Sequence, residues 1–208
     1  MINYNLIATA LKKYTDAGFI NIDTPWWTSE QASYSTIPKD INVFTIGTDR
    51  PNDPNRIKNN LGYLVGSAEQ GFVQLMLNNL LKPSELYISA GPCFRNESNL
   101  DDLHLQSFFK IELMAYFGDN IQDKHVTERA IQKMVDVAYK CISSLPGLTS
   151  EIKIVKTEQG IDLELNGIEI GSYGHRTFRN HNWVYGTGLA EPRFSLANKH
   201  KNTDKTTY

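Results

Sequence analysis

The stretch Cys93-Phe94-Arg95-Asn96-Glu97, followed by His104, Phe108 and Glu112, places an arginine, acids and an aromatic ring around one charged loop. A buried strand would end at Arg95, and the chain would return through the loop into Phe108. An arginine at a strand end can hold a phosphate by two hydrogen bonds, and a nearby ring offers a purine a stacking face. A surface Arg–Glu pair beside core phenylalanines would look the same, so this stretch alone leaves both interpretations open.

A second cluster consists of acids on a predicted β-hairpin over residues 161–171, with Asn166-Gly167 as a two-residue turn. This turn would place Glu164 opposite Glu169, with Asp162 on the same face. Like charges so close repel, and a divalent cation such as Mg²⁺ carrying nucleotide phosphates would offset the repulsion. The alternative is a solvated face on which the carboxylates splay apart.

The third cluster is Gly186-Thr187-Gly188-Leu189-Ala190-Glu191-Pro192-Arg193. Glycines at a strand end before a helix would let a ligand approach the backbone, and Arg193 in the first helical turn could reach a terminal phosphate. An ordinary strand-to-helix turn is the alternative.

The elements that must position these residues follow from hydrophobic periodicity. It predicts helices over 3–16, 68–81, 122–143 and 191–198, and strands over 19–24, 61–65, 86–94, 108–117, 152–155, 161–165, 168–173 and 183–186. Antiparallel hairpins interleaved with helices indicate an α+β domain with an antiparallel β-sheet flanked by helices. We expect one domain over 1–198, a polar loop over 47–60 that could serve as a lid, and a disordered tail over 199–208.

Composition restricts the class of protein. The chain of 208 residues suits one domain, and its net charge of −2 argues mildly against a surface that grips tRNA. Its two cysteines have no metal-ligand spacing, and no run is apolar enough for a membrane span or signal peptide. We therefore expect a cytoplasmic protein that does not engage a membrane.

In chain order, these pieces resemble the three signature motifs of class II aminoacyl-tRNA synthetases. Residues 18–25 resemble motif one, a dimer-interface element; Phe94-Arg95-Asn96-Glu97 with His104 and Phe108 resembles motif two; and 186–193 resembles motif three. The resemblance spans about residues 1–198. It implies a class II core with an antiparallel sheet flanked by helices, and a homodimer.

The resemblance also implies roles at an ATP site. Arg95 would bridge the α-phosphate of ATP and the carboxylate of an amino acid. Phe108 would stack on adenine, with Arg193 on its other side reaching the γ-phosphate. His104 would approach the γ-phosphate, and Glu97 would fix the adenine and its loop.

Within the class, the aspartyl, asparaginyl and lysyl subgroup is most similar. Asp162 and Glu169 resemble the subgroup's Mg²⁺-binding hairpin, and Arg176 falls where the aspartyl enzyme binds the side-chain carboxylate of its substrate. Glu69, in Ser67-Ala68-Glu69, and Glu112 fall near contacts to the substrate's amino group. This implies an aspartate-like substrate, although Arg176 could equally be a structural arginine.

The sequence departs from the family pattern in two places. The glycine-rich run after the metal-binding acid is replaced by Ser172-Tyr173-Gly174-His175, which could reshape the amino-acid pocket. In motif three, Ala190 stands where glycine is common and Pro192 where an acid is common. We also find no anticodon-binding domain in this sequence.

The implied chemistry is attack of an amino-acid carboxylate on the α-phosphate of ATP, which forms an aminoacyl adenylate. The expected function is a ligase that passes the acyl group to an acceptor other than tRNA, such as ammonia, a small molecule or a protein amine. Two alternatives remain at this point. One is a catalytically inactive, dimeric paralogue that binds nucleotide or a partner protein, and the other is a truncated synthetase that still uses tRNA.

Overall fold

A computed structural model describes residues 1–37, 43–47, 60–119 and 123–200. The predicted loop over 47–60 therefore falls mostly outside the described residues, as does the predicted tail beyond residue 200. Of the tail, Lys199 is still helical, so the last helix runs slightly further than the sequence predicted.

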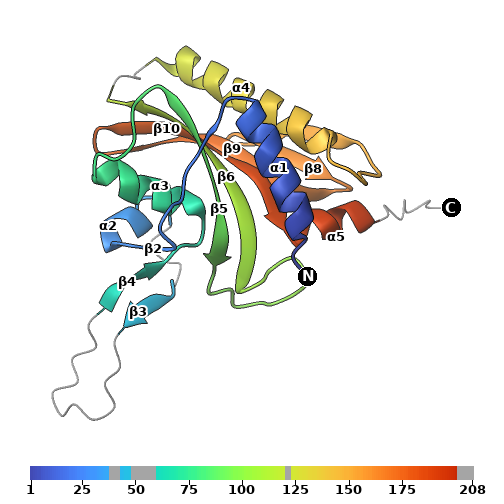
Figure 1. Cartoon of the computed structure of the whole chain (residues 1–208), viewed down its shortest axis with the longest axis horizontal. Coiled ribbons are helices and arrows are strands. Elements are labelled where there is room, and N and C mark those ends of the chain that lie inside the picture. Colours follow the sequence, from blue (N-terminus) through green and yellow to red (C-terminus); the bar gives the residue numbers. More distant parts are fainter. Residues whose placement is uncertain (38–42, 48–59, 120–122, 201–208) are drawn as a thin grey trace, which may run out of the picture.

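Within the described residues, a seven-stranded sheet has the order β1-β5-β6-β10-β9-β8-β7. Its strands are β1 (Ile20–Asn21), β5 (Glu85–Phe94), β6 (Ser107–Gly118), β7 (Ile152–Lys156), β8 (Ile161–Leu165), β9 (Ile168–Phe178) and β10 (His181–Glu191). The pair β1–β5 is parallel and the other neighbours are antiparallel. The predicted antiparallel sheet flanked by helices is confirmed (Figure 1).

A smaller sheet has the order β2-β4-β3 among the described strands, with β2 (Trp27–Thr28), β3 (Thr45–Gly47) and β4 (Asn60–Leu64). The helices are α1 (Tyr4–Asp16), α2 (Glu30–Ser33), α3 (Ala68–Leu77), α4 (Lys124–Ser143) and α5 (Arg193–Lys199). The sequence did not predict β2, α2 or β3, which are too short for a clear periodic signal. The predicted strand over 19–24 is only two residues long, Ile20–Asn21.

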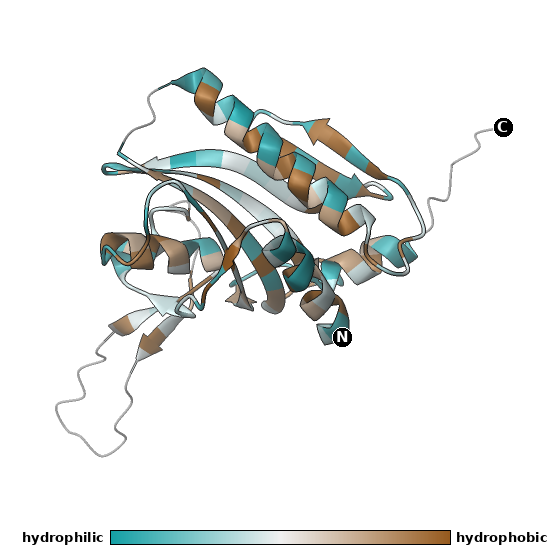
Figure 2. Ribbon diagram, turned by 45° about the horizontal axis from the view of Figure 1, so that its top comes forward, coloured by the Kyte–Doolittle hydropathy of each residue, from teal (hydrophilic) through white to brown (hydrophobic). Residues whose placement is uncertain are grey.

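One face of the large sheet is covered by α1, α4 and α5. Their apolar side chains, among them Leu6, Tyr14, Val135 and Phe194, pack on inward-facing sheet residues such as Leu113. Figure 2 shows polar and apolar segments alternating along α4, as expected for a helix with one buried face.

On the opposite face, α3 covers only one end of the sheet. There Phe72 and Met76 pack on Met114, Tyr116 and Trp183. Because side chains alternate along a strand, the residues of β6 that continue this face are Phe108, Lys110 and Glu112. The uncovered end of this face therefore carries charged side chains.

A bulge in β10 helps to separate the two faces. Its register with β6 shifts between Thr187 and Leu189. The carbonyl oxygens of Thr187 and Gly188 accept hydrogen bonds from the buried phenols of Tyr173 (2.6 Å) and Tyr14 (2.8 Å). Burial raises the pKa of both phenols, which stay neutral and remain hydrogen-bond donors.

The glycines of the third sequence cluster have a different role from the one predicted. A Cβ at Gly186 would lie 2.4 Å from Tyr173 Cδ1, and one at Gly188 would lie 2.6 Å from Ile111 Cγ2. Both positions face the helix-covered core, so the glycines make room for packed side chains and not for a ligand. The sequence showed only that the two glycines allow another group to approach the backbone closely. It did not show on which face of the sheet this approach occurs.

The predicted turn at Asn166-Gly167 is confirmed. Both residues have positive φ, 53° and 78°, as a two-residue hairpin of type I′ requires. Leu165 pairs with Ile168 and Glu164 with Glu169, as the turn predicted.

We predict that Gly186→Ala and Gly188→Ala each destabilise the fold by about 1–3 kcal/mol, because the added methyl group overpacks the core. Urea unfolding followed by circular dichroism measures this loss. Gly66→Ala is the control, because a Cβ there would lie 3.5 Å from the nearest atom, which is ordinary contact. Near-neutral results at Gly186 and Gly188 would contradict the packing role.

Candidate functional site

Two adjoining hollows lie on the uncovered face of the large sheet. They share five lining residues: Arg95, Glu97, Lys110, Glu169 and Thr187. These come from β10, β6, the start of β9 and the chain that follows β5, so the junction depends on the tertiary fold.

The first hollow lies beside the start of α5. Beyond the shared residues it is lined by Asp102, Leu103, Leu105, Phe108, Ile170, Ala190, Glu191, Pro192 and Arg193. The residues predicted to bind ATP are therefore brought together here, except His104.

The second hollow extends toward α3. Beyond the shared residues it is lined by Thr36, Ile37, Val43, Gly66, Ser67, Glu69, Gln70, Phe94, Asn96, Glu112, Gln159, Ser172, Arg176 and Tyr185. The three residues predicted to bind the amino acid, Glu69, Glu112 and Arg176, all line it.

Arg95 stands at the junction of the two hollows. Its Nε donates to the carbonyl oxygen of Gly66 at 3.2 Å, and its guanidinium carbon lies 5.0 Å from the centre of the Phe108 ring. A cation in this position attracts the ring face and also presents donors to anions in either hollow.

Arg193 is the first residue of α5 and points into the first hollow. Its Nη2 donates to the carbonyl oxygen of Leu103 at 3.1 Å, and its Nη1 lies 3.9 Å from Glu169 Oε1. The helix start is fixed by the buried Glu191, which accepts a hydrogen bond from Ser195 at 2.8 Å.

The predicted pair of metal-binding acids is only partly assembled. Glu169 lines both hollows, but Asp162 lines neither, although its partner across the strands, Ser172, lines the second hollow. In the described part of the chain, no group of three or more His, Cys, Asp or Glu side chains stands close enough to hold a metal. Glu169 fits Mg²⁺ that is carried mainly by phosphate oxygens and water, since such ions need only one or two carboxylates.

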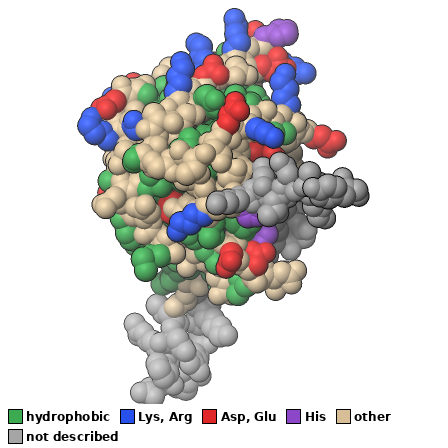
Figure 3. All heavy atoms as spheres, turned by 90° about the vertical axis from the view of Figure 1, so that its right-hand side faces the viewer, with side chains coloured by type: hydrophobic (Ala, Val, Ile, Leu, Met, Phe, Trp, Pro, Cys, Tyr) green, Lys and Arg blue, Asp and Glu red, His purple; other side chains and the backbone are tan. Residues whose placement is uncertain are grey.

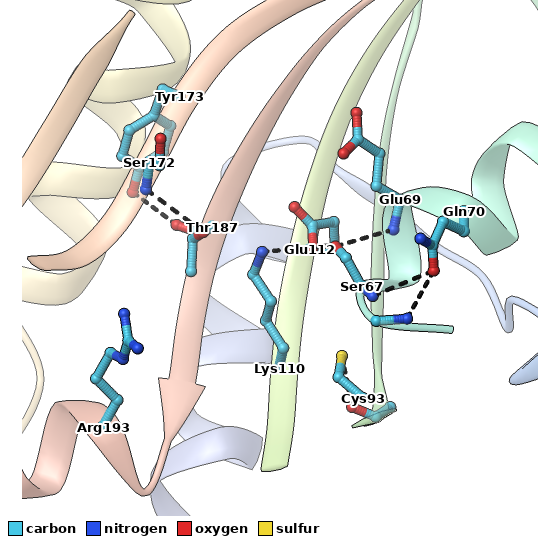
Figure 4. A network of polar contacts seen from close by, with 12 residues as sticks. Ser67, Glu69, Gln70, Cys93, Lys110, Glu112, Ser172, Tyr173, Thr187 and Arg193 are labelled. Atoms are coloured by element: carbon cyan, nitrogen blue, oxygen red, sulfur yellow. Dashed lines mark hydrogen bonds and ion pairs between the residues drawn. The ribbon is translucent and has the colours of Figure 1, made fainter. Parts of the chain in front are cut away.

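A buried ion pair forms the floor between the hollows. Lys110 Nζ lies 2.8 Å from Glu112 Oε2, with the lysine side chain 13% and the glutamate 1% exposed. Ser67, the N-cap of α3, donates to the same carboxylate (Figure 4). Burial raises the pKa of Glu112, and Lys110 counteracts this rise.

A second ion pair lies at the inner end of the second hollow. The carboxylate of the buried Glu69 accepts from Trp183 Nε1 at 2.7 Å and from Arg176 Nη1. The guanidinium carbon of Arg176 lies 4.2 Å from the centre of the Tyr185 ring. Burial alone would lower the pKa of Arg176, but the neighbouring Glu69 raises it, so the side chain is a permanent cation.

His104 does not line either hollow. Its Nδ1 lies 2.9 Å from both carboxylate oxygens of Asp101, which also accepts from the backbone N–H groups of Leu103 and His104. The side chain thus stabilises the loop between β5 and β6, a local contact that motif comparison could not distinguish from a phosphate contact.

Sequence reasoning missed Lys110, Tyr185 and Thr187. Lys110 alternates with Phe108 and Glu112 on β6, and Thr187 lies between two glycines that face the core. Lys110 could have been predicted, because residues two apart on a strand share a face and Lys110 lies between Phe108 and Glu112. The β10 bulge could not be read from sequence, so Thr187 gave no such signal.

Comparison with known proteins identifies the class. The fold matches seryl-tRNA synthetase from Pyrococcus horikoshii complexed with ATP (TM-score 0.70, 16% identity, 92% of this chain and 49% of that chain). It also matches Naegleria fowleri serine-tRNA ligase in complex with AMP (TM-score 0.67, 14% identity, 93% and 48%). A third match is the pyrrolysyl-tRNA synthetase PylSc of Desulfitobacterium hafniense (TM-score 0.64, 15% identity, 93% and 67%).

These likenesses define a class II aminoacyl-tRNA synthetase fold, and the chain spans about half the length of the seryl enzymes it matches. A family profile described as tRNA synthetases class II (D, K and N) matches residues 1–208, so the chain belongs to the class II tRNA synthetase family. No curated protein sequence matches the chain significantly.

Removing Lys110 tests the buried ion pair. We predict that Lys110→Met destabilises the protein by about 3 kcal/mol at pH 8, because it leaves the Glu112 carboxylate buried and unpaired. Burial raises the folded-state pKa of Glu112 above its unfolded-state value. The protein is therefore most stable with respect to this group at low pH, where the carboxyl is protonated in both states, and it loses stability as pH rises toward the folded-state pKa. Lys110→Met removes the cation that counteracts this rise, so the pKa of Glu112 increases further. The loss of stability relative to the wild type should therefore be smaller at pH 5 than at pH 8. Urea unfolding at both pH values measures the effect.

In the double variant Lys110→Met, Glu112→Gln, the loss of stability should no longer depend on pH, because no titrating carboxyl remains at position 112. Lys124→Met is the exposed control, since Lys124 and Glu128 are 3.7 Å apart with side chains 86% and 56% exposed. An equal deficit for Lys110→Met at pH 5 and pH 8 would mean that Lys110 contributes only packing.

Proposed function

We propose that this domain, over residues 1–198, is an ATP-dependent ligase that couples an amino acid to AMP as an aminoacyl adenylate. The observation that carries the proposal is the position of Arg95 at the junction of two hollows. One hollow collects the predicted ATP residues and the other collects the predicted amino-acid residues. A group at their junction can contact both reactants where the new bond forms.

The chemistry requires positioning more than acid–base groups. The amino-acid carboxylate is already ionised, so it can attack the α-phosphorus without a general base, and pyrophosphate leaves with the electron pair of the broken P–O bond. Arg95 would offset the charge that builds on the α-phosphate. Lys110 also lines the junction, but it is already paired with Glu112. Holding both reactants in one cleft supplies the proximity that the reaction needs.

The first hollow suits the nucleotide. Phe108, Glu97 and Arg193 all line it. The ring of Phe108 would offer adenine a stacking face, and Arg193 would contact the terminal phosphates. Mg²⁺ held by phosphate oxygens and Glu169 would supply further positive charge to the leaving pyrophosphate. The seryl enzymes that share the fold were solved with ATP or AMP, which supports a nucleotide here.

The identity of the amino acid depends on the charge around Arg176. The sequence predicted an aspartate-like substrate of the aspartyl, asparaginyl and lysyl subgroup because of Arg176. Arg176 is already paired with Glu69, so aspartate and its neutral analogue asparagine are the substrates to compare.

For the acyl acceptor we propose ammonia, a small molecule or a protein amine rather than tRNA. The chain carries 21 Lys and Arg against 23 Asp and Glu, whereas nucleic-acid binders are usually basic. On the face shown in Figure 3, Lys and Arg side chains at the upper edge are interspersed with Asp and Glu.

Amino-acid-dependent exchange of labelled pyrophosphate into ATP tests adenylate formation. We expect exchange with a narrow set of the twenty amino acids, and a loss of about 100-fold or more in Arg95→Ala, because one cation at the reacting phosphate is removed. Arg193→Ala should weaken ATP use through the terminal phosphates. Arg129→Ala, an exposed arginine on α4, is the matched control and should keep full activity.

Full exchange by Arg95→Ala would contradict the site assignment. Absence of exchange with every amino acid, with ATP binding intact, would favour the inactive regulatory paralogue. If exchange occurs, adding ammonia, amines or tRNA and identifying the product separates the acceptors.

We further propose that the chain forms a homodimer. The segment after β1 and the neighbouring strand β4 expose large apolar side chains, with Trp26 58%, Trp27 52% and Leu61 50% exposed. Exposed tryptophans on neighbouring segments favour a protein–protein interface, where aromatic residues are enriched.

Sedimentation equilibrium should therefore give twice the chain mass of 23.6 kDa, and Trp26→Ser combined with Trp27→Ser should shift it toward the monomer. Leu80→Ser, an exposed apolar residue after α3, is the control and should leave the mass unchanged. A wild-type monomer at micromolar concentration would contradict this proposal.

A further inference from the structure

The inner end of the second hollow contains an arginine whose charge is already neutralised. Arg176 is bound through Nη1 to the carboxylate of Glu69, and its side chain is 34% exposed toward the hollow. Glu69 is only 4% exposed and is also held by Trp183 Nε1 at 2.7 Å. The carboxylate therefore cannot swing away without leaving a buried indole N–H unpaired.

The second buried carboxylate of the hollow is also paired, and Glu97 and Glu169 add negative charge where the two hollows meet. Glu112 is paired with Lys110 at 2.8 Å, which leaves no spare cation at that position. Arg95 is the remaining cation, but it stands at the junction with the first hollow, where the reacting carboxylate and the α-phosphate must be bound. The inner end of the hollow is therefore close to neutral before any substrate enters.

A substrate with a carboxylate at the end of its side chain would place a second anion on a guanidinium that Glu69 already occupies. Two carboxylates sharing one partly buried cation repel, and one of them would have to take up a proton or leave. A neutral amide or hydroxyl meets no such cost, because its oxygen can accept from the free N–H groups of Arg176.

We infer that Glu69 is a specificity-determining residue: by neutralising Arg176 it restricts the amino-acid subsite to uncharged polar side chains and excludes side-chain carboxylates. The inference rests on the proposed adenylate-forming function. It is selectivity by a repulsive element, since Glu69 need not contact the preferred substrate's side chain to reject the wrong one. Asparagine and aspartate form the sharpest test pair because they differ only by amide and carboxylate.

The experiment compares pyrophosphate exchange with asparagine, glutamine, serine, threonine, aspartate and glutamate in the wild type and in Glu69→Gln. The wild type should use at least one neutral member at least tenfold better, in kcat/KM, than either acid. Glu69→Gln keeps an oxygen that can accept from Trp183 but frees the Arg176 charge, so its aspartate-to-asparagine ratio should rise at least tenfold.

Arg176→Gln is the second variant and leaves Glu69 as an unpaired anion. It should not gain activity with aspartate, and binding of lysine or ornithine should improve relative to the wild type. Glu128→Gln, an exposed acid on α4, changes the net charge equally and should leave all ratios unchanged. Circular dichroism and thermal melting establish whether each variant is folded.

The outcomes separate the inference from the proposed function. A wild type that activates aspartate best overturns the inference while the ligase function stands, and this measurement does not depend on any variant folding. A folded Glu69→Gln whose ratio stays within threefold of wild type also overturns it. If no amino acid supports exchange, the proposed function fails. The inference is then decided by calorimetric binding with ATP present, where Glu69→Gln must gain affinity for aspartate at least tenfold or the inference is rejected.

Discussion

Two buried carboxylates can exist in the floor of the site only because each has a cation and a further hydrogen-bond donor within reach. Glu112 has Lys110 and Ser67, and Glu69 has Arg176 and Trp183. A buried carboxylate without such partners would cost several kcal/mol. The arrangement of α3, β6, β9 and β10 is therefore constrained at the point where these partners meet. The floor of the hollow therefore contains charged side chains whose charges cancel in pairs.

The large sheet divides its two faces between stability and binding. On one face, the helices pack on apolar residues, and the buried phenols of Tyr14 and Tyr173 bind the backbone where β10 bulges. Gly186 and Gly188 belong to this face because there is no room there for a side chain. Between them Thr187 faces the hollows. Packing on the helix-covered face thus fixes the position of β10, and the opposite face of this strand carries the site.

Membership of the class II synthetase family gives a context for these charges but does not assign them. The solved relatives are at most 16% identical, so they establish the fold, and their substrates need not be those of this chain. The state of these charges is set by the pairing within the site itself. Arg95 keeps N–H groups that a ligand can use, and Arg193 pairs with the exposed Glu169 at 3.9 Å, whereas Lys110 and Arg176 are held by buried carboxylates. A nucleotide and a largely neutral side chain fit this distribution better than two anionic ligands would.

The sequence by itself determined the long elements and many of the residues that line the candidate site. Apolar periodicity identified the long helices and strands, Asn166-Gly167 fixed the register of the hairpin pairs Leu165–Ile168 and Glu164–Glu169, and the ordered motifs selected Arg95, Phe108 and Arg193. These signals are local, and each needs only the spacing of a few neighbouring residues.

Only the tertiary structure decided which side chains are paired and which face each residue occupies. Glu69 and Arg176 are 107 residues apart in the chain, so no local pattern could show that the arginine already has a partner. Asp162 lies outside the hollows that Glu169 lines, and a contact to Asp101 holds His104 in its loop. Bulges and long-range ion pairs depend on packing between distant elements. That is why the sequence could name many residues that line the hollows but not their electrostatic state.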